Sequence, residues 1–69
     1  MAERLANRLK EKRAELSLTQ AELAERVGVT RKTVNTVENG VFVPSTLLAL
    51  KMAAALSVPL EDLFWVEPA

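Results

Sequence analysis

The sequence predicts an all-α fold of five short helices, with a short strand over residues 64–67 after the fifth. Apolar residues recur at spacings of three and four positions, which is the period of a helix with one buried face. Thr or Ser residues that can cap a helix precede three such segments, and both glycines follow one, where a left-handed residue can end a helix. The 69 residues predict a single small domain, which would bury only about 60% of the surface of its unfolded chain.

The first helix is predicted over about residues 2–16. The apolar residues of that segment form one stripe at helical spacing: Leu5, Ala6, Leu9 and Leu16. Arg13 lies where another apolar residue would continue the stripe, and burying its charge without a partner would cost on the order of several kcal/mol. Glu38 is the candidate partner, because it follows the inward-facing Val37 at the end of the third helix. In the alternative interpretation, Arg13 extends into solvent and Glu38 only precedes a turn.

The second helix is predicted over about residues 20–27. Thr19 can accept a hydrogen bond from the backbone of Glu22 while the Glu22 side chain reaches back to the Thr19 amide, which is a capping box. Gly28 follows the last apolar residue of this segment immediately, and it can supply the left-handed conformation that ends a helix.

The third helix is predicted over about residues 31–38, after a short turn. Thr30 can cap it, and Asn39 with Gly40 supplies its stop signal. Two capped helices joined by so short a turn predict a helix-turn-helix at about residues 20–38. In this motif one helix supports the other, which is held out at the width of a DNA major groove.

The outward face of the third helix carries candidate DNA-reading side chains. Val34 and Val37 form its inward pair, so the polar residues near its amino end look outward. Arg can pair with guanine, Lys with guanine or phosphate, Asn with adenine, and a Thr methyl group can contact thymine. The candidate base-reading residues are therefore Arg31, Lys32, Asn35 and Thr36. The alternative is that they are ordinary solvated residues of a surface helix.

The fourth helix, at about residues 45–56, is apolar nearly all round, with Lys51 as its one charge. A fifth helix at about residues 60–64 and a tail at 65–69 add large apolar side chains that an isolated 69-residue domain would struggle to bury. We therefore expect a homodimer, with an interface that includes Leu47, Leu60, Leu63, Phe64, Trp65 and Val66. In the alternative, the small alanines tolerate solvent and Trp65 closes the core of one protomer.

The composition argues against an enzyme and against bound metals or cofactors. The chain has no His, no Cys and no Tyr, so the usual general bases, thiol nucleophiles and nitrogen or sulfur metal ligands are missing. No run approaches the ~20 apolar residues of a membrane-spanning helix, and the charged amino end lacks the apolar core of a signal peptide. We expect a soluble cytoplasmic protein without a membrane partner.

The charge is less basic than is usual for a DNA-binding protein. Residues 1–40 carry eight Lys or Arg against six Asp or Glu, whereas residues 41–69 carry one against three, for a net charge of zero. The predicted helix-turn-helix thus lies in the more positive part, and we expect a shallow dependence of DNA binding on salt. An alternative function is a protein-interaction module or antitoxin, which binds a toxin or a sensor domain through the apolar Val41, Phe42 and Val43 and the tail.

Four motifs occur at fixed separations: LTQAELA at residues 18–24, VGVTR at 27–31, VENG at 37–40 and PS at 44–45. Together they resemble the Xre, or lambda Cro/C1-type, family of bacterial and phage transcriptional regulators over about residues 5–65. Small dimeric repressors of the cytolysin repressor type are similar in length. The resemblance implies a five-helix, lambda-repressor-like domain that binds a palindromic operator as a symmetric dimer, with its third helix in the major groove.

The resemblance also implies roles for individual residues. Base reading carries over to Arg31, Lys32 and Thr36, and a phosphate contact at the start of the second helix carries over to Gln20. Contacts with the sugar-phosphate backbone carry over to Thr30, Thr33 and Asn39. An Arg-to-Glu tie in this family matches Arg13 and Glu38. Family members commonly have a basic residue where this chain has Val41, Phe42 and Val43, which implies a weaker hold on phosphate.

Overall fold

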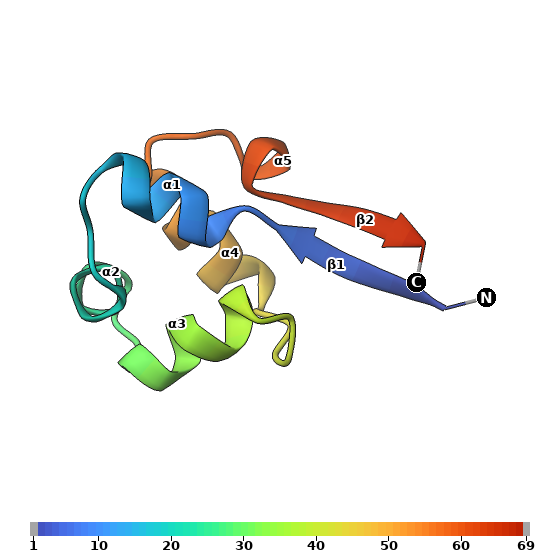
Figure 1. Ribbon diagram of the computed structural model, residues 1–69, viewed down its shortest axis with the longest axis horizontal. Coiled ribbons are helices and arrows are strands. Elements are labelled where there is room, and N and C mark those ends of the chain that lie inside the picture. Colours follow the sequence, from blue (N-terminus) through green and yellow to red (C-terminus); the bar gives the residue numbers. More distant parts are fainter. Residues whose placement is uncertain (1, 69) are drawn as a thin grey trace.

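The computed structural model describes residues 2–68, which form five helices and a two-stranded antiparallel sheet. Figure 1 shows the helices gathered in one body, from which the sheet projects to one side. The elements in chain order are β1 (Glu3–Asn7), α1 (Leu9–Glu15), α2 (Gln20–Val27), α3 (Arg31–Glu38), α4 (Thr46–Ala55), α5 (Leu60–Leu63) and β2 (Phe64–Pro68). The fold is therefore mostly helical, as predicted.

Local sequence signals account for the start and the end of α2. The Thr19 hydroxyl accepts from the Glu22 amide at 3.0 Å, and the Glu22 carboxylate accepts from the Thr19 amide at 2.9 Å. The Thr19 amide first and the Thr19 hydroxyl second stabilise the charged Glu22 carboxylate, and they lower the pKa of Glu22. The helix ends at Gly28, whose left-handed φ of 76° is a conformation that side chains with a Cβ rarely adopt.

The same kind of local signal determines where α3 begins and ends. The Thr30 hydroxyl accepts from the Thr33 amide at 3.2 Å, and the chain turns at Gly40, which has a φ of 72°. Val34 and Val37 of α3 are buried against the rest of the core. The predicted helix-turn-helix at residues 20–38 is thereby confirmed, with α2 as the support and α3 as the exposed helix.

The core lies between α1, α2, α3, α4 and α5. Its largest fully buried side chains are Leu9, Leu23, Met52, Leu63, Val34 and Val37. α2 packs against both α3 and α4, so α2 connects α3 to α4 within the core. The Ser45 hydroxyl caps α4 by accepting from the Leu48 amide at 3.1 Å.

The prediction of a first helix over residues 2–16 is wrong for its amino-terminal part. Residues 3–7 form β1, which pairs with β2 in a register that places Leu5 opposite Val66 and Ala6 opposite Trp65. The helix α1 begins only at Leu9, whose amide donates to the Asn7 side-chain oxygen at 3.0 Å. The local sequence favours a helix, but pairing with the β-prone residues of the carboxyl-terminal segment overrides that preference.

The expected strand after the fifth helix is confirmed as β2, and the sheet gives it a partner that the sequence did not reveal. Residue 69, the last of the predicted tail, lies outside the described residues. Leu16, which the prediction placed in the buried stripe of the first helix, follows the end of α1 and is exposed.

Candidate nucleic-acid interface

The exposed face of α3 carries three of the four predicted base-reading residues. Arg31, Lys32 and Asn35 are exposed, and they line one shallow hollow together with Gln20 of α2. Their spacing explains this arrangement, because residues four positions apart on a helix lie on one face. The hollow therefore combines two positive charges with two side-chain amides, which are groups that suit base edges and phosphates.

Thr36, the fourth predicted reader, is more restricted. It is half-buried, and its hydroxyl lies 3.1 Å from the Lys32 carbonyl and 3.0 Å from the Thr33 carbonyl, to which it can donate. Because the hydroxyl proton is used within α3, the groups that remain for DNA are the methyl group and the oxygen lone pairs. This arrangement suits contact with a thymine methyl better than donation to a base.

The predicted sugar-phosphate contacts lie at the two ends of α3. Thr30 and Thr33 place their hydroxyls 3.0 Å apart at the amino end. Asn39 donates from its side chain to the Asn35 side-chain oxygen at 3.2 Å at the carboxyl end. Thr30 and Asn39 are exposed and Thr33 is half-buried, so these polar groups flank the base-reading residues on the same helix.

Arg13 and Glu38 lie side by side. The Arg13 Nε donates to one Glu38 oxygen at 2.8 Å and its Nη2 to the other at 3.3 Å, while its Nη1 donates to the Leu18 carbonyl at 2.8 Å. The side chains are 15% and 5% exposed, respectively, so the Arg13 head group does not extend freely into solvent. The ion pair fixes α3 to α1 with a forked geometry.

Gln20 has a role that the sequence reasoning missed. Its side-chain amide donates to the Glu38 carboxylate at 3.1 Å, so this carboxylate receives donors from both α1 and α2. Gln20 also lines the hollow at α3, where the predicted phosphate contact would lie. No sequence pattern predicts the contact between Gln20 and Glu38, because it depends on how α2 packs against α3.

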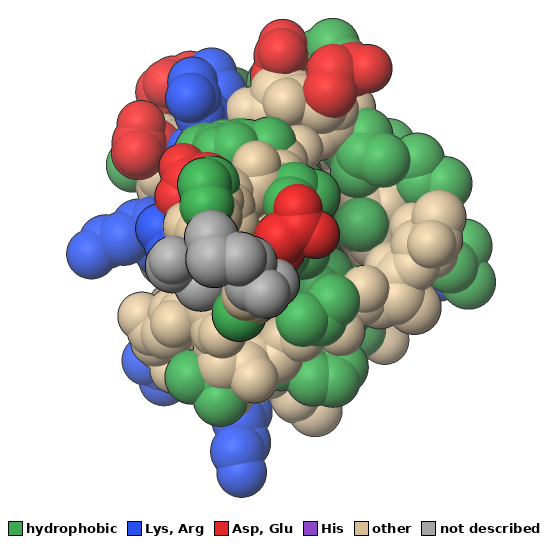
Figure 2. Space-filling view, turned by 90° about the vertical axis from the view of Figure 1, so that its right-hand side faces the viewer, with side chains coloured by type: hydrophobic (Ala, Val, Ile, Leu, Met, Phe, Trp, Pro, Cys, Tyr) green, Lys and Arg blue, Asp and Glu red, His purple; other side chains and the backbone are tan. Residues whose placement is uncertain are grey.

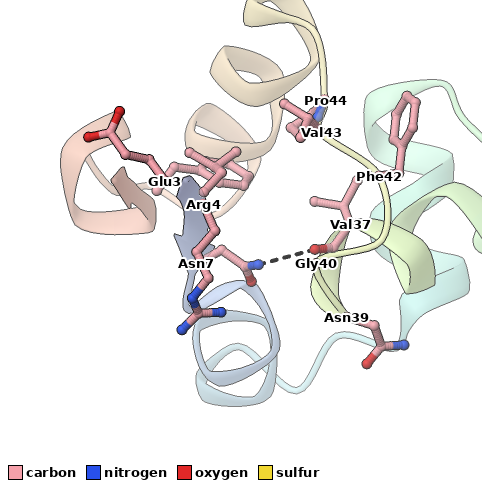
Figure 3. Close-up of a pocket in the computed structure, with 11 residues that line it drawn as sticks. Glu3, Arg4, Asn7, Val37, Asn39, Gly40, Phe42, Val43 and Pro44 are labelled. Atoms are coloured by element: carbon pink, nitrogen blue, oxygen red, sulfur yellow. Dashed lines mark hydrogen bonds between the residues drawn. The ribbon is translucent and has the colours of Figure 1, made fainter. Parts of the chain in front are cut away.

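Asn7 is a second residue that the sequence reasoning missed. Its side-chain amide donates to the Val37 carbonyl of α3 at 3.1 Å. Figure 3 shows this bond across a pocket of about 280 Å³, which lies between β1 and the segment that joins α3 to α4. The sequence predicts a helix over residues 2–16 and so does not indicate this contact. Asn7 reaches α3 because it lies at the end of the strand β1.

The predicted dimer residues fall into two groups. Leu63 and Phe64 are 0% and 6% exposed and belong to the core of their own protomer, so they leave almost no side-chain surface for a partner. Leu60 is half-buried against the core, and the half-buried Trp65 ring lies under the Arg8 guanidinium at 4.8 Å. Leu47 and Val66 remain available, at 65% and 63% exposed.

Further exposed apolar side chains extend this surface. We define the apolar face as Val43, Leu47, Leu50 and Val66, all of which are exposed. Val43 and Val66 line a groove of about 400 Å³ between the sheet and α4, and Leu47 and Leu50 lie one turn apart on α4. Figure 2 shows hydrophobic side chains gathered along one side of the molecule. Exposed apolar patches on small domains are candidate interaction sites.

The charges are partly separated despite the net charge of zero. Figure 2 shows the acidic side chains mainly toward the upper edge, where Lys and Arg also lie at the left, whereas only Lys and Arg project from the lower edge, on the side of α3. The exposed face of α3 therefore lies in the more positive part of the surface, which suits a polyanion.

Among residues 2–68, no group of three or more His, Cys, Asp or Glu side chains is placed to hold a metal ion. No helix of that part of the chain is both long and apolar enough to cross a membrane.

Comparisons with known proteins agree with this geometry. A family model described as Helix-turn-helix matches residues 9–63. The uncharacterized HTH-type transcriptional regulator YgzD of Bacillus subtilis is 51% identical over 63 residues, which is 91% of this chain and 96% of that protein. An uncharacterized HTH-type transcriptional regulator of Methanothermobacter thermautotrophicus is 53% identical over 57 residues, 81% of this chain and 83% of that protein. The crystal structure of the restriction-modification controller protein C.AhdI from Aeromonas hydrophila is similar with a TM-score of 0.76 and 36% identity, over 80% of this chain and 83% of that one.

Proposed function

The chain belongs to the helix-turn-helix family of Xre, or Cro/C1-type, DNA-binding transcriptional regulators, and from this premise we propose that it is a repressor that binds a palindromic operator as a homodimer. In each protomer α3 enters the major groove. Arg31, Lys32, Asn35 and Thr36 read bases, and Gln20, Thr30, Thr33 and Asn39 hold the sugar-phosphate backbone. We assign the protein no catalytic role, and we place it in a bacterial cytoplasm, with the DNA.

The observation that carries the proposal is the exposed polar face of α3. Arg31, Lys32 and Asn35 share one hollow with Gln20, and the helix that presents them is tied to the core by buried valines and by the Glu38 carboxylate. A rigid helix with a forked cation and amides on its outer face is suited to direct readout of a major groove.

The apolar face supports the homodimer part of the proposal. Val43, Leu47, Leu50 and Val66 are exposed and apolar on one small protomer, and a second copy is an economical partner for them because a twofold contact uses the same surface twice. A twofold dimer also presents two copies of α3, as a palindrome with half-sites roughly 34 Å apart requires.

Selection from a random duplex pool tests the proposal directly. We expect the wild-type protein to enrich a sequence with two inverted half-sites, and Arg31→Ala/Lys32→Ala to weaken binding to it by about tenfold or more. Lys10→Ala/Arg26→Ala is the matched control, because it removes one Lys and one Arg from exposed positions of α1 and α2 and should retain the selected sequence. A folded wild-type protein that enriches no sequence would refute the proposal.

The exposed loop after α3 favours a second candidate function. Val41, Phe42 and Val43 are exposed apolar neighbours, and with the net charge of zero they suit a protein-interaction module or an antitoxin that holds a toxin or a sensor domain. Val41→Ser/Phe42→Ser, at two exposed residues outside the apolar face, separates the two functions in a pull-down from the native host followed by identification of bound protein. Loss of one stoichiometric partner, with operator binding retained, would favour the second function as an additional role.

A further inference from the structure

Asn7 occupies a junction between three elements of the fold. It is the last residue of β1, and its side-chain oxygen accepts from the Leu9 amide at 3.0 Å, where α1 begins. Its side-chain nitrogen donates to the Val37 carbonyl at 3.1 Å, in the last turn of α3 (Figure 3). Both ends of this one amide group are therefore used, and they join a strand, the start of one helix and the end of another.

The strand that carries Asn7 is itself held to the carboxyl-terminal segment. Asn7 lies opposite Phe64 in the sheet, and the next residue, Arg8, donates from its amide to the Leu63 carbonyl at 3.1 Å. The sheet also carries Val66, which belongs to the apolar face. Asn7 is thus a polar link between α3 and the sheet that supplies part of the proposed dimer contact.

A separate link holds the adjacent residue of α3. Glu38 follows Val37 directly, and its carboxylate receives the Arg13 guanidinium from α1 and the Gln20 amide from α2. The end of α3 is therefore held by α1 and α2 through one residue and by the sheet through the residue before it. Two links at neighbouring positions on different sides therefore add to the packing of Val34 and Val37, and they restrict the tilt of α3 more than one link would.

We propose that Asn7 is a positioning residue, which sets the direction of α3 relative to the apolar face and thereby the half-site spacing that the dimer accepts. This inference rests on the proposed function. In a symmetric dimer the separation of the two recognition helices follows from their direction relative to the twofold axis, and the spacing of the half-sites mirrors it. Asn7 touches no base in this arrangement, so its effect is on geometry and not on readout.

Asn7→Asp tests the inference with little change in size. The aspartate keeps the oxygen that caps α1 but loses the N–H that reaches the Val37 carbonyl. Asn7→Ser is a second variant, because a serine can also cap α1 but is too short to bridge to α3. Ala14→Gly is the matched control: Ala14 is exposed on α1, and glycine there destabilises the helix without touching the link to Val37.

The measurement is binding to operators in which the spacing between two selected half-sites is changed in steps of one base pair. For the wild type and for Ala14→Gly we expect the same preferred spacing. For Asn7→Ser we expect preference for that spacing over its neighbours to fall by about two- to tenfold, the range that corresponds to one neutral hydrogen bond. For Asn7→Asp we expect a fall at least as large, because its carboxylate also repels the Val37 carbonyl oxygen.

One result would contradict the inference about Asn7, and a different result would contradict the proposed function. If the Asn7 variants weaken binding at all spacings equally, as Ala14→Gly does, then Asn7 only stabilises the fold and the inference is wrong. If the wild type itself selects no pair of half-sites, the proposed function fails before Asn7 is tested.

Discussion

At the scale of single residues, Glu38 does the most to fix the candidate interface. Its carboxylate is nearly buried and accepts from two nitrogens of Arg13 and from the amide of Gln20. These charge-assisted bonds offset the cost of removing the carboxylate from water. Because the three donors come from α1 and α2, this one side chain joins the supporting helices to α3.

Glu38→Gln should therefore be strongly destabilising, because it leaves the Arg13 charge largely buried without its partner. We expect a loss of about 3 kcal/mol in the free energy of unfolding, measured by urea titration with the fluorescence of Trp65, the single tryptophan. Glu15→Gln is the control, since it breaks the exposed Lys12–Glu15 pair and should cost no more than about 0.5 kcal/mol. Equal losses in the two variants would contradict the role given to Glu38.

Glu67 makes the sheet sensitive to acid. The Trp65 indole donates to its carboxylate at 2.8 Å and Arg4 at 2.7 Å, and these partners, the indole first, lower the pKa of Glu67 below 4.5. A lowered pKa in the folded state means that the stabilisation is present above the unfolded value and is lost as the pH falls through the folded value.

We therefore expect Glu67→Gln to be less stable than the wild type at pH 7 and to approach it as the pH falls below about 4.5. Thermal unfolding at a series of pH values, followed by Trp65 fluorescence, measures this convergence. Glu25→Gln on α2 makes the same change of charge away from the sheet and serves as control. A difference between Glu67→Gln and the wild type that stays constant down to pH 2 would refute this account.

At the scale of the elements, the sequence predicted best what depends on neighbouring residues. The bounds of α2 and α3 follow from Thr19, Gly28 and Thr30, each of which acts on backbone within four positions. The strand β1 could not be predicted in this way, since its own residues favour a helix and its partner lies at the other end of the chain.

The same distinction, between local spacing and tertiary packing, applies to the candidate site. The outward placement of Arg31, Lys32 and Asn35 follows from helical spacing alone and was predictable. The link from Asn7 to α3 depends on tertiary packing, and so does the burial of Leu63 and Phe64. Both side chains join the core cluster with residues of the other helices, a packing that sequence spacing does not indicate.

The turn between α2 and α3 offers a test at this scale. In Gly28→Ala the added Cβ would meet nothing within 4 Å, so the cost comes from the left-handed backbone at a φ of 76°. We expect a loss of about 1 kcal/mol in the free energy of unfolding, and a smaller one for Gly28→Asn, because asparagine tolerates this conformation better. Urea titration measures both, and an unchanged midpoint for Gly28→Ala would show that the turn relaxes.

At the scale of the whole molecule, the proposed function needs two surfaces at once, the apolar face for the contact between protomers and α3 for the contact with DNA. Leu47→Glu should convert the proposed homodimer to a monomer, because it places a charge on an exposed residue of the proposed twofold contact. Sedimentation equilibrium measures the mass, and operator affinity should fall with it. Leu16→Glu makes the same change at an exposed leucine beyond α1 and should remain dimeric. If both variants keep the mass of the wild type, this face is not the dimer contact.

The sheet also has a consequence for how the chain folds. Arg4 and Glu67, which pair across it, are 63 positions apart, whereas α2 and α3, which contact each other, are joined by residues 28–30 alone. Closing a long loop costs more entropy than closing a short one, and contacts distant in sequence form slowly. We therefore expect refolding followed by Trp65 fluorescence to lag behind refolding followed by helical circular dichroism. A newly synthesised chain would then gain its first helices early, and would complete its sheet only after β2 has been made.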